Sequence, residues 1–296
     1  MRIPDFFVVG SAKSGTTSLW QYLGQHPQIF MTDDISAKEL GYYCYHYGIK
    51  ELDKYTAYFK DAKPEQLVGE SCHAYLSSPE SAELIHKAQP GAKIIMLLRN
   101  PVDRAYSLYN WMAAHGYEPS KTFEQAIALE EKRVADPGFI DDNPQGFYMN
   151  YYYFRSGLYA EQIERYFRIF GREQCRVFIF EEIRGKWSEA AKDVFSFLGV
   201  DSSFNPVIEV HNESQRVWSS AWQFYFRYGL TDKLKAWGMS SGKATKLSAR
   251  LMKMNVSDKK PIPLKKETRK ILLDRYRDDI EKTARLLGKD LSLWLT

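Results

Sequence analysis

The stretch from Phe6 to Ser18 constrains this chain more than any other, because an apolar run, a glycine-bounded turn and a helix start follow one another without a gap. Residues 6–9 are aromatic or β-branched, which favours a buried strand, and Gly10 ends them. From Leu19 onward, apolar residues recur at helical spacing. A helix N-terminus after such a turn offers unpaired N–H groups and its positive dipole end to an anion. We therefore predict a strand, a phosphate-binding loop and a helix.

The spacing of this loop resembles that of the nucleotide-binding P-loop, with one departure. Four residues separate Gly10 from Gly15, as in the P-loop, and Thr17 supplies the hydroxyl that follows. Thr16, however, occupies the position of the P-loop lysine, and the lysine of this chain, Lys13, comes earlier. The moved charge favours a donor with a shorter phosphate chain than ATP. A plain turn of small residues between a strand and a helix is the simpler alternative.

Composition is that of an ordinary globular protein. The 296 residues are 44% hydrophobic, enough for a sizeable core, and we expect a single domain over residues 1–296. The net charge of +4, from 41 basic and 37 acidic residues, is too small to indicate a nucleic-acid partner. Three cysteines without metal-ligand spacing predict neither a disulfide framework nor a metal site. Without a signal peptide or a bilayer-spanning apolar run, we expect a cytoplasmic location.

Two further strand-like runs end in polar residues. Residues 67–69 precede Glu70, and the continuous apolar run 93–98, typical of a parallel sheet covered on both faces, precedes Arg99. Carboxyl ends of parallel strands meet at one edge of a sheet, where open α/β folds bind ligands. The sequence therefore predicts an α/β fold in which one pocket contains Lys13, Glu70 and Arg99.

The rest of the chain reads mostly as helices. We expect a strand at 177–180 and helices at 79–88, from Pro101, and at 122–135, 159–170, 187–198 and 265–287. The aromatic segment 147–154, between turn signals, is predicted to be a lid or substrate loop. Residues 217–256 combine aromatic and basic residues in a helical, acceptor-side segment. A solvated helical face is the simpler interpretation of the positive charge of this segment. A basic face that binds an acidic acceptor or a membrane surface is the more specific interpretation.

Two motifs together resemble the signatures of sulfotransferases that use 3′-phosphoadenosine 5′-phosphosulfate (PAPS). The loop Lys13-Ser14-Gly15-Thr16-Thr17 is similar to the first signature. The segment Arg99-Asn100-Pro101-x-x-Arg104-Ala105-Tyr106-Ser107 is similar to the second, and residues 287–294 to a C-terminal signature. The resemblance runs from about Phe6 to Trp294 and points to a free-standing bacterial-type branch related to the heparan sulfate sulfotransferases. It implies a three-layer α/β sandwich with a central parallel sheet and a P-loop-like phosphosulfate-binding loop.

The resemblance also implies the residues that hold the donor. They are Lys13, Ser14, Gly15, Thr16, Thr17, Ser18, Arg99 and Ser107. Arg99 and Ser107 would bind the 3′-phosphate of PAPS. The chain lacks the Lys-Gly-Arg loop that adds to this site in the heparan sulfate branch, so Arg216 is our candidate for the third contact. A surface salt bridge is the alternative role of Arg216.

The expected chemistry is in-line attack of an acceptor oxygen on sulfur, for which no metal is required. Lys13 would stabilise the charge that develops on the bridging oxygen. The acceptor hydroxyl must lose a proton, and Glu70, in a segment similar to the one that carries the catalytic carboxylate in the heparan sulfate branch, is our first candidate for the base. His73 is the second. Lys38, in a Lys38-Glu39 pair that resembles one on the acceptor side of the family, would orient the acceptor or assist the base, and this pair is the next place to look for one.

The acceptor stays open at this stage. A hydroxyl or amine of a glycan, glycolipid or secondary metabolite fits the resemblance, and a hydroxyacyl chain on a carrier protein is an alternative. A P-loop kinase is the competing class of enzyme; it needs carboxylates for Mg²⁺, for which Glu181 and Glu182 are the candidates. A nucleotide-binding module without catalysis is the third hypothesis. The oligomeric state is not predicted.

Overall fold

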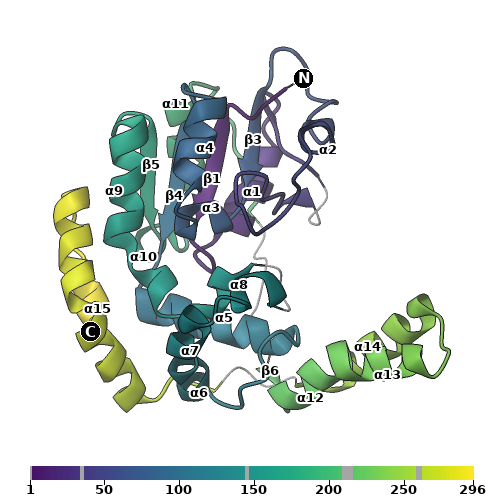
Figure 1. The fold of residues 1–296 in the computed structure, drawn as a ribbon. Helices are drawn as coiled ribbons and strands as arrows, with labels where there is room; N and C mark the ends of the chain where they lie inside the picture. The colour runs from purple at the N-terminus through teal and green to yellow at the C-terminus, as the bar shows by residue number, and fades with distance from the viewer. Residues whose placement is uncertain (1, 34–36, 144–146, 209–215, 258–261) are drawn as a thin grey trace. The chain divides into compact units, whose positions relative to one another are not determined.

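The computed structural model describes residues 2–33, 37–143, 147–208, 216–257 and 262–296 (Figure 1). They divide into two compact units: the first comprises residues 1–104, 158–211 and 275–296, and the second comprises residues 105–157 and 212–274. The expectation of a single domain over residues 1–296 stays a prediction. Among the described residues, no helix is long and apolar enough to cross a membrane.

The first unit is built on a five-stranded sheet with the order β2-β3-β1-β4-β5, in which every pair is parallel. The strands are β1 (Phe6–Gly10), β2 (Ile29–Phe30), β3 (Leu67–Ser71), β4 (Lys93–Leu98) and β5 (Cys175–Ile179). Val8 in β1 pairs with Ser71 on one side and with Ile95 on the other. The predicted α/β fold with a central parallel sheet is therefore confirmed.

Helices cover both faces of this sheet (Figure 1). On one face, Val8, Ile95 and Leu97 pack in a common core with side chains of α1 (Thr16–Gly24) and α11 (Trp187–Leu198). On the other, Phe7 contacts Tyr75 of α3 (Ala74–Ser77) edge to face. The helices α4 (Ser81–Ala88) and α9 (Tyr159–Phe170) accompany α3 on that face. Alternating strand residues thus bury both sides of the sheet, as the continuous apolar runs predicted.

Most predicted elements begin and end where local signals placed them. Gly171 and Gly199, both with positive φ, follow α9 and α11 directly. One prediction was wrong: the helix expected at 122–135 is two helices, α6 (Phe123–Ala128) and α7 (Glu130–Ala135), joined at Leu129. The Thr122 side chain still caps the first of them by accepting a hydrogen bond from the Gln125 N–H at 3.2 Å.

The other elements outside the second unit's hairpin are α2 (Leu52–Ala57), α5 (Pro101–Ala114), α8 (Phe139–Asp142), α10 (Phe180–Ile183), α15 (Lys266–Leu287) and the short 3₁₀ helices Tyr148–Tyr151, Arg155–Gly157 and Ser292–Leu295.

The second unit has an aromatic core and a helical hairpin. In the segment predicted as a lid, Phe147, Tyr151, Tyr152 and Tyr153 are buried, and the Tyr153 hydroxyl donates to the buried Glu118 carboxylate at 2.9 Å. This segment therefore supplies core packing, and its role as a lid or substrate loop stays a prediction. The hairpin consists of α12 (Ser220–Phe224), a π-helical turn η4 (Tyr225–Leu230), α13 (Thr231–Ala236) and α14 (Ser241–Met254), beside the short pair β6 (Arg216–Val217) and β7 (Val256–Ser257).

Candidate functional site

The sheet order brings three of the predicted site residues to one edge. Lys13 follows β1, Arg99 follows β4, and Glu70 lies in β3, and these three strands are direct neighbours. Glu70 was expected after its strand, but β3 continues through Ser71 because Gly69 and Glu70 pair in register with Phe6 and Phe7. The Glu70 side chain therefore lies in the protein interior rather than in a surface loop.

The loop after β1 has the geometry of an anion cradle. Gly15, at the N-terminus of α1, has a φ of 92°, and the non-glycine Lys13 has a φ of 65°. The hydroxyls of Ser11 and Ser14 lie 2.7 Å apart, and the Ser11 N–H donates to the Leu97 carbonyl at 2.7 Å, which ties the loop to β4. A side chain at position 15 would meet the Trp187 ring at 2.5 Å. The loop is thus held as a tight turn directly before the first N–H groups of α1, which is where a helix can bind an anion.

Positive charge is concentrated at this loop. Burial, together with the nearby charges of Arg99 and Lys38, lowers the pKa of Lys13 to about 8. The Arg99 guanidinium donates to the Lys13 carbonyl at 3.1 Å and lies over the Phe180 ring, 5.0 Å from its centroid. Burial likewise lowers the pKa of Arg99. A bound anion would relieve the repulsion that these cations exert on one another, which fits a phosphate or phosphosulfate ligand.

Glu70 is clamped by two tyrosines. It is 2% exposed, and the hydroxyls of Tyr55 and Tyr75 donate to its two carboxylate oxygens, each at 2.5 Å. Burial raises the pKa of Glu70 to about 7, although the two tyrosine hydrogen bonds act against this rise. Both oxygens are thus already engaged, and the carboxyl is only partly ionised at neutral pH.

A second carboxylate, Glu39, forms a network with two other predicted site residues. The backbone N–H and the Nδ1 atom of His73 both lie 2.8 Å from its Oε2 atom, and the Lys38 ammonium donates to its Oε1 atom. Burial raises the pKa of Glu39, but His73 and Lys38 outweigh it and hold that pKa well below its usual range. Glu39 is therefore an ionised carboxylate. It holds the His73 ring through the Nδ1 atom and the backbone through the N–H group.

The C-terminal signature has a structural role at the same edge of the sheet. The buried Trp294 donates its indole N–H to Glu181 at 3.0 Å, and its carbonyl accepts from the Asn100 side chain at 3.1 Å. The other Glu181 oxygen accepts the Asn100 backbone N–H at 2.9 Å. Asn100 follows Arg99 directly, so these contacts fix the backbone that presents Arg99. The sequence motif did not predict these contacts around Asn100, because they form only when the C-terminal end of the chain packs beside the end of β4.

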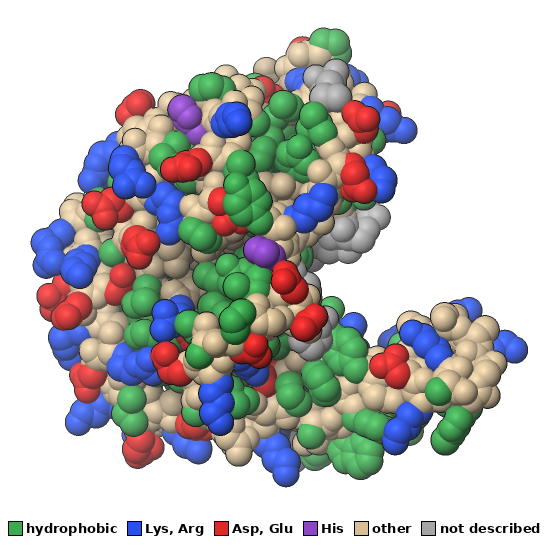
Figure 2. All heavy atoms as spheres, viewed as in Figure 1, with side chains coloured by type: hydrophobic (Ala, Val, Ile, Leu, Met, Phe, Trp, Pro, Cys, Tyr) green, Lys and Arg blue, Asp and Glu red, His purple; other side chains and the backbone are tan. Residues whose placement is uncertain are grey.

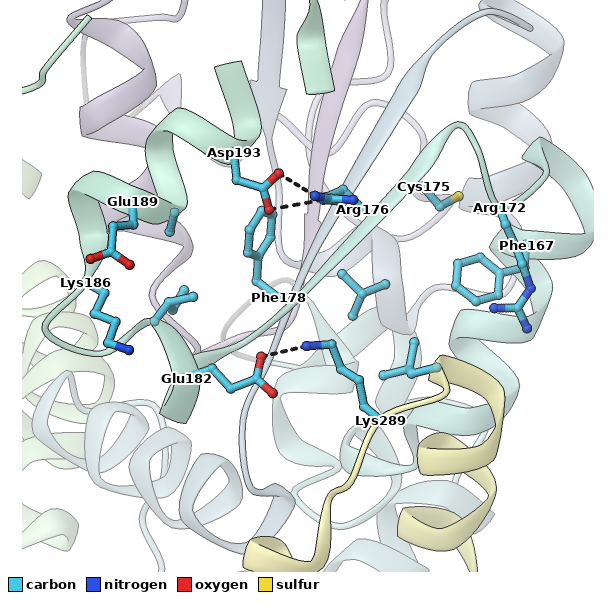
Figure 3. A pocket seen from close by; sticks show the side chains of 14 residues that line it. Phe167, Arg172, Cys175, Arg176, Phe178, Glu182, Lys186, Glu189, Asp193 and Lys289 are labelled. Atoms are coloured by element: carbon cyan, nitrogen blue, oxygen red, sulfur yellow. Dashed lines mark hydrogen bonds and ion pairs between the residues drawn. The ribbon is translucent and has the colours of Figure 1, made fainter. Parts of the chain in front are cut away.

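A cavity of about 540 Å³ lies beside β5 and is not the candidate donor site (Figure 3). None of the predicted donor-binding residues lines it. Its charges are largely paired: Arg176 binds Asp193, and Lys289 binds Glu182 at 2.7 Å. Glu181 and Glu182, the carboxylates considered for a kinase metal site, are thus both occupied by contacts within the protein.

The remaining predicted residues have the following places. Ser14 is buried in the loop, Thr16 is buried in the first turn of α1, and Thr17 and Ser18 follow it half-buried. Ser107 lies in α5 and Arg216 in β6, in parts of the chain that belong to the second unit. Their contacts with the donor stay predictions. Sequence reasoning missed Tyr55 in α2 and Tyr75 in α3, because no local pattern links these short helices to a strand next to them in space.

Comparison with known proteins agrees with this geometry. Residues 3–246 match the family described as the sulfotransferase domain. The crystal structure of a sulfotransferase from Alicyclobacillus acidocaldarius superposes with a TM-score of 0.75 at 28% identity, over 100% of both chains. The bifunctional heparan sulfate N-deacetylase/N-sulfotransferase 4 of Mus musculus is 26% identical over 99% of this chain and 31% of its own length. The membrane-associated sulfotransferase kil1 of Dictyostelium discoideum is 37% identical over 45% of this chain and 29% of its own length.

The family match covers well over half of the chain, so the chain belongs to the sulfotransferase family, whose members are transferases related to the heparan sulfate sulfotransferases. The family resemblance inferred from the sequence motifs is therefore confirmed. The chain spans less than a third of the length of the two curated relatives named above.

Proposed function

We propose that this protein transfers a sulfuryl group from PAPS to a hydroxyl group of an acceptor. The observation that carries the proposal is the position of Lys13. Its ammonium belongs to a loop at a helix N-terminus, with Arg99 and Lys38 near enough to lower its pKa. One edge of the sheet thus combines an anion cradle, a cluster of cations and candidate bases, which are the parts that sulfuryl transfer needs.

The residues of the loop fit the donor. The N–H groups and hydroxyls from Ser14 to Ser18 would bind its 5′-phosphosulfate, and Arg99 with Ser107 would bind its 3′-phosphate, with Arg216 as the third contact. When bound, PAPS supplies an activated sulfuryl group and a leaving group, adenosine 3′,5′-bisphosphate. The hydrogen bonds of Ser11 with Ser14 and with β4 favour a preformed cradle, which would lower the ordering cost of donor binding.

In the proposed step, a bond forms between the acceptor oxygen and sulfur while the bond between sulfur and the bridging oxygen of the 5′-phosphate breaks. Electrons move onto that bridging oxygen, and Lys13 stabilises the charge there. The hydroxyl proton passes to a base on the acceptor side. Lys38, buried and paired with Glu39, would orient the acceptor and keep that base ionised.

For the base, the geometry favours the Glu39–His73 pair over Glu70. Glu70 was preferred from the sequence, but it is 2% exposed and its two oxygens already accept from Tyr55 and Tyr75. Glu39 is ionised, more exposed than Glu70, and bonded to His73. We propose that this pair takes the proton. Glu70 would then hold the Tyr55 and Tyr75 hydroxyls in place.

The proposed acceptor is a glycan or glycolipid hydroxyl. The relative named for heparan sulfate N-sulfation supports a saccharide, although that activity is stated for a protein more than three times as long. Transfer to a hydroxyacyl chain on a carrier protein and transfer to a secondary metabolite remain alternatives. A kinase is not favoured, because the family match is to sulfotransferases and Glu181 and Glu182 bind partners within the chain.

The function is tested by incubating the protein with PAPS and a panel of neutral and acidic saccharides, glycolipids and small alcohols. We expect acceptor-dependent release of adenosine 3′,5′-bisphosphate and, by mass spectrometry, a product that carries one added sulfuryl group on oxygen. Phosphorylated products from ATP and Mg²⁺, with none from PAPS, would instead assign a kinase.

A further inference from the structure

Small and polar residues, together with Leu234, lie inside the helical hairpin of the second unit. The helices α12, η4 and α13 run on as one segment, and α14 packs back against it. Where they meet, the hydroxyls of Thr231 and Ser248 lie 2.7 Å apart, Ala244 is fully buried and Leu234 is nearly so. The Gln223 side chain anchors the base of the hairpin by donating to the Ala114 carbonyl at 2.8 Å. Helix pairs usually bury their large apolar residues at such an interface.

Several large apolar side chains of this hairpin lie on its outside instead. Trp237, at the turn between α13 and α14, is 80% exposed, Met254 is 72% exposed and Trp222 is 57% exposed. Trp222 stacks on Phe226 with ring centroids 5.6 Å apart, so the aromatic surface continues along the helix. Single exposed apolar residues are normal, but several on one small hairpin mark an interaction surface.

Positive charge accompanies these residues. Residues 217–257 contain seven lysines and arginines but a single acid, Asp232. On α14, Lys243, Lys246 and Arg250 follow helical spacing, so they share one stripe of that helix. Figure 2 shows Lys and Arg side chains next to hydrophobic ones over these helices. The hairpin therefore carries both exposed apolar side chains and an excess of positive charge.

We propose that the hairpin 220–254 docks this protein on an anionic lipid bilayer. Tryptophan at the headgroup level and lysines facing acidic lipids are the chemistry of interfacial binding, in which charge attracts and apolar side chains insert. An acidic polysaccharide would use the cations but offers no apolar interior for Trp237 and Met254. A second copy of the chain would place two strongly positive hairpins against each other. The inference does not depend on the identity of the acceptor.

The test is sedimentation with vesicles of phosphatidylcholine alone or mixed with phosphatidylserine, at low and high salt. The full chain should bind the mixed vesicles, bind phosphatidylcholine far more weakly, and lose binding as salt rises. The double variant Lys246→Glu/Arg250→Glu should lower binding by roughly tenfold or more, because each cation near an acidic surface contributes measurably. Trp237→Ala should lower binding to the mixed vesicles at low salt by roughly tenfold.

Matched controls separate docking from general charge and folding effects. Lys266→Glu/Lys270→Glu reverses two exposed charges at the same spacing on α15, and Leu293→Ala removes an equally exposed apolar side chain; both should bind as the parent does. Circular dichroism and melting temperature check that each variant is folded. Equal binding to both vesicle types, equal loss in the α15 control, binding to heparin without binding to vesicles, or a dimer that buries Trp237 would each overturn the proposal.

Discussion

The Lys13→Ala variant is expected to lose roughly 10²–10³-fold in turnover, the usual cost of removing one charged group that stabilises a transition state. The lysine charge matters most when the bridging oxygen becomes anionic, so donor affinity should change far less than the rate. The measurement is kcat and donor KM at saturating acceptor, with the affinity for adenosine 3′,5′-bisphosphate determined separately. A rise in KM alone, with kcat unchanged, would make Lys13 a plain binding residue.

The pH dependence supplies an internal control for this variant. Lys13 carries its charge below its pKa of about 8 and loses it above. The kcat/KM for the donor should therefore fall as the pH rises through about 8 in the parent protein. In Lys13→Ala this alkaline limb should be absent, and in Lys13→Arg it should move to higher pH because arginine stays protonated. An identical limb in all three proteins would assign it to another group.

The Glu39→Gln variant is expected to lower turnover by roughly 10²–10⁴-fold, the usual contribution of a positioned base. Glutamine keeps the size of the side chain but not its charge. It can therefore neither accept a proton nor stabilise a protonated His73, whose Nδ1 atom lies 2.8 Å from the carboxylate in the parent. Donor binding should survive, because Glu39 faces His73 and Lys38. The measurement is single-turnover transfer with the donor prebound.

Glu70→Gln is the matched comparison, because it makes the same substitution at a carboxylate that accepts hydrogen bonds from two tyrosines. If Glu39 and His73 form the base, Glu70→Gln should cost clearly less than Glu39→Gln, and His73→Ala should resemble Glu39→Gln. The opposite order, with Glu70→Gln the slowest and Glu39→Gln within about threefold of the parent, would restore Glu70 as the base and disprove the pairing.

Local patterns were sufficient to predict the frame of the site. Continuous apolar runs marked β1 and β4, and glycines with positive φ ended α9 and α11 where the sequence placed their ends. Since parallel strands present their carboxyl ends at one edge, the order of strands and polar residues along the chain was enough to assign Lys13, Glu70 and Arg99 to that edge.

The details of the base could not be predicted in this way. Tyr55 reaches Glu70 from a separate helix, and Glu39 reaches His73 from an irregular segment, so both pairings depend on how the chain packs. The environment of Glu70, which decides its pKa, is likewise a tertiary property. The extension of β3 through Ser71, which buries Glu70, was decided by pairing with β1 rather than by the residues of β3 themselves.

The most direct test of the central claim, that this protein is built to use PAPS, is a comparison of ligands by calorimetry and melting temperature. Adenosine 3′,5′-bisphosphate should bind and raise the melting temperature, whereas adenosine 5′-monophosphate should do so weakly, because only the former carries the 3′-phosphate proposed for Arg99 and Ser107. ATP with Mg²⁺ should bind no better than the monophosphate. Equal shifts from adenosine 3′,5′-bisphosphate and the monophosphate, or tighter binding of ATP with Mg²⁺, would contradict this claim.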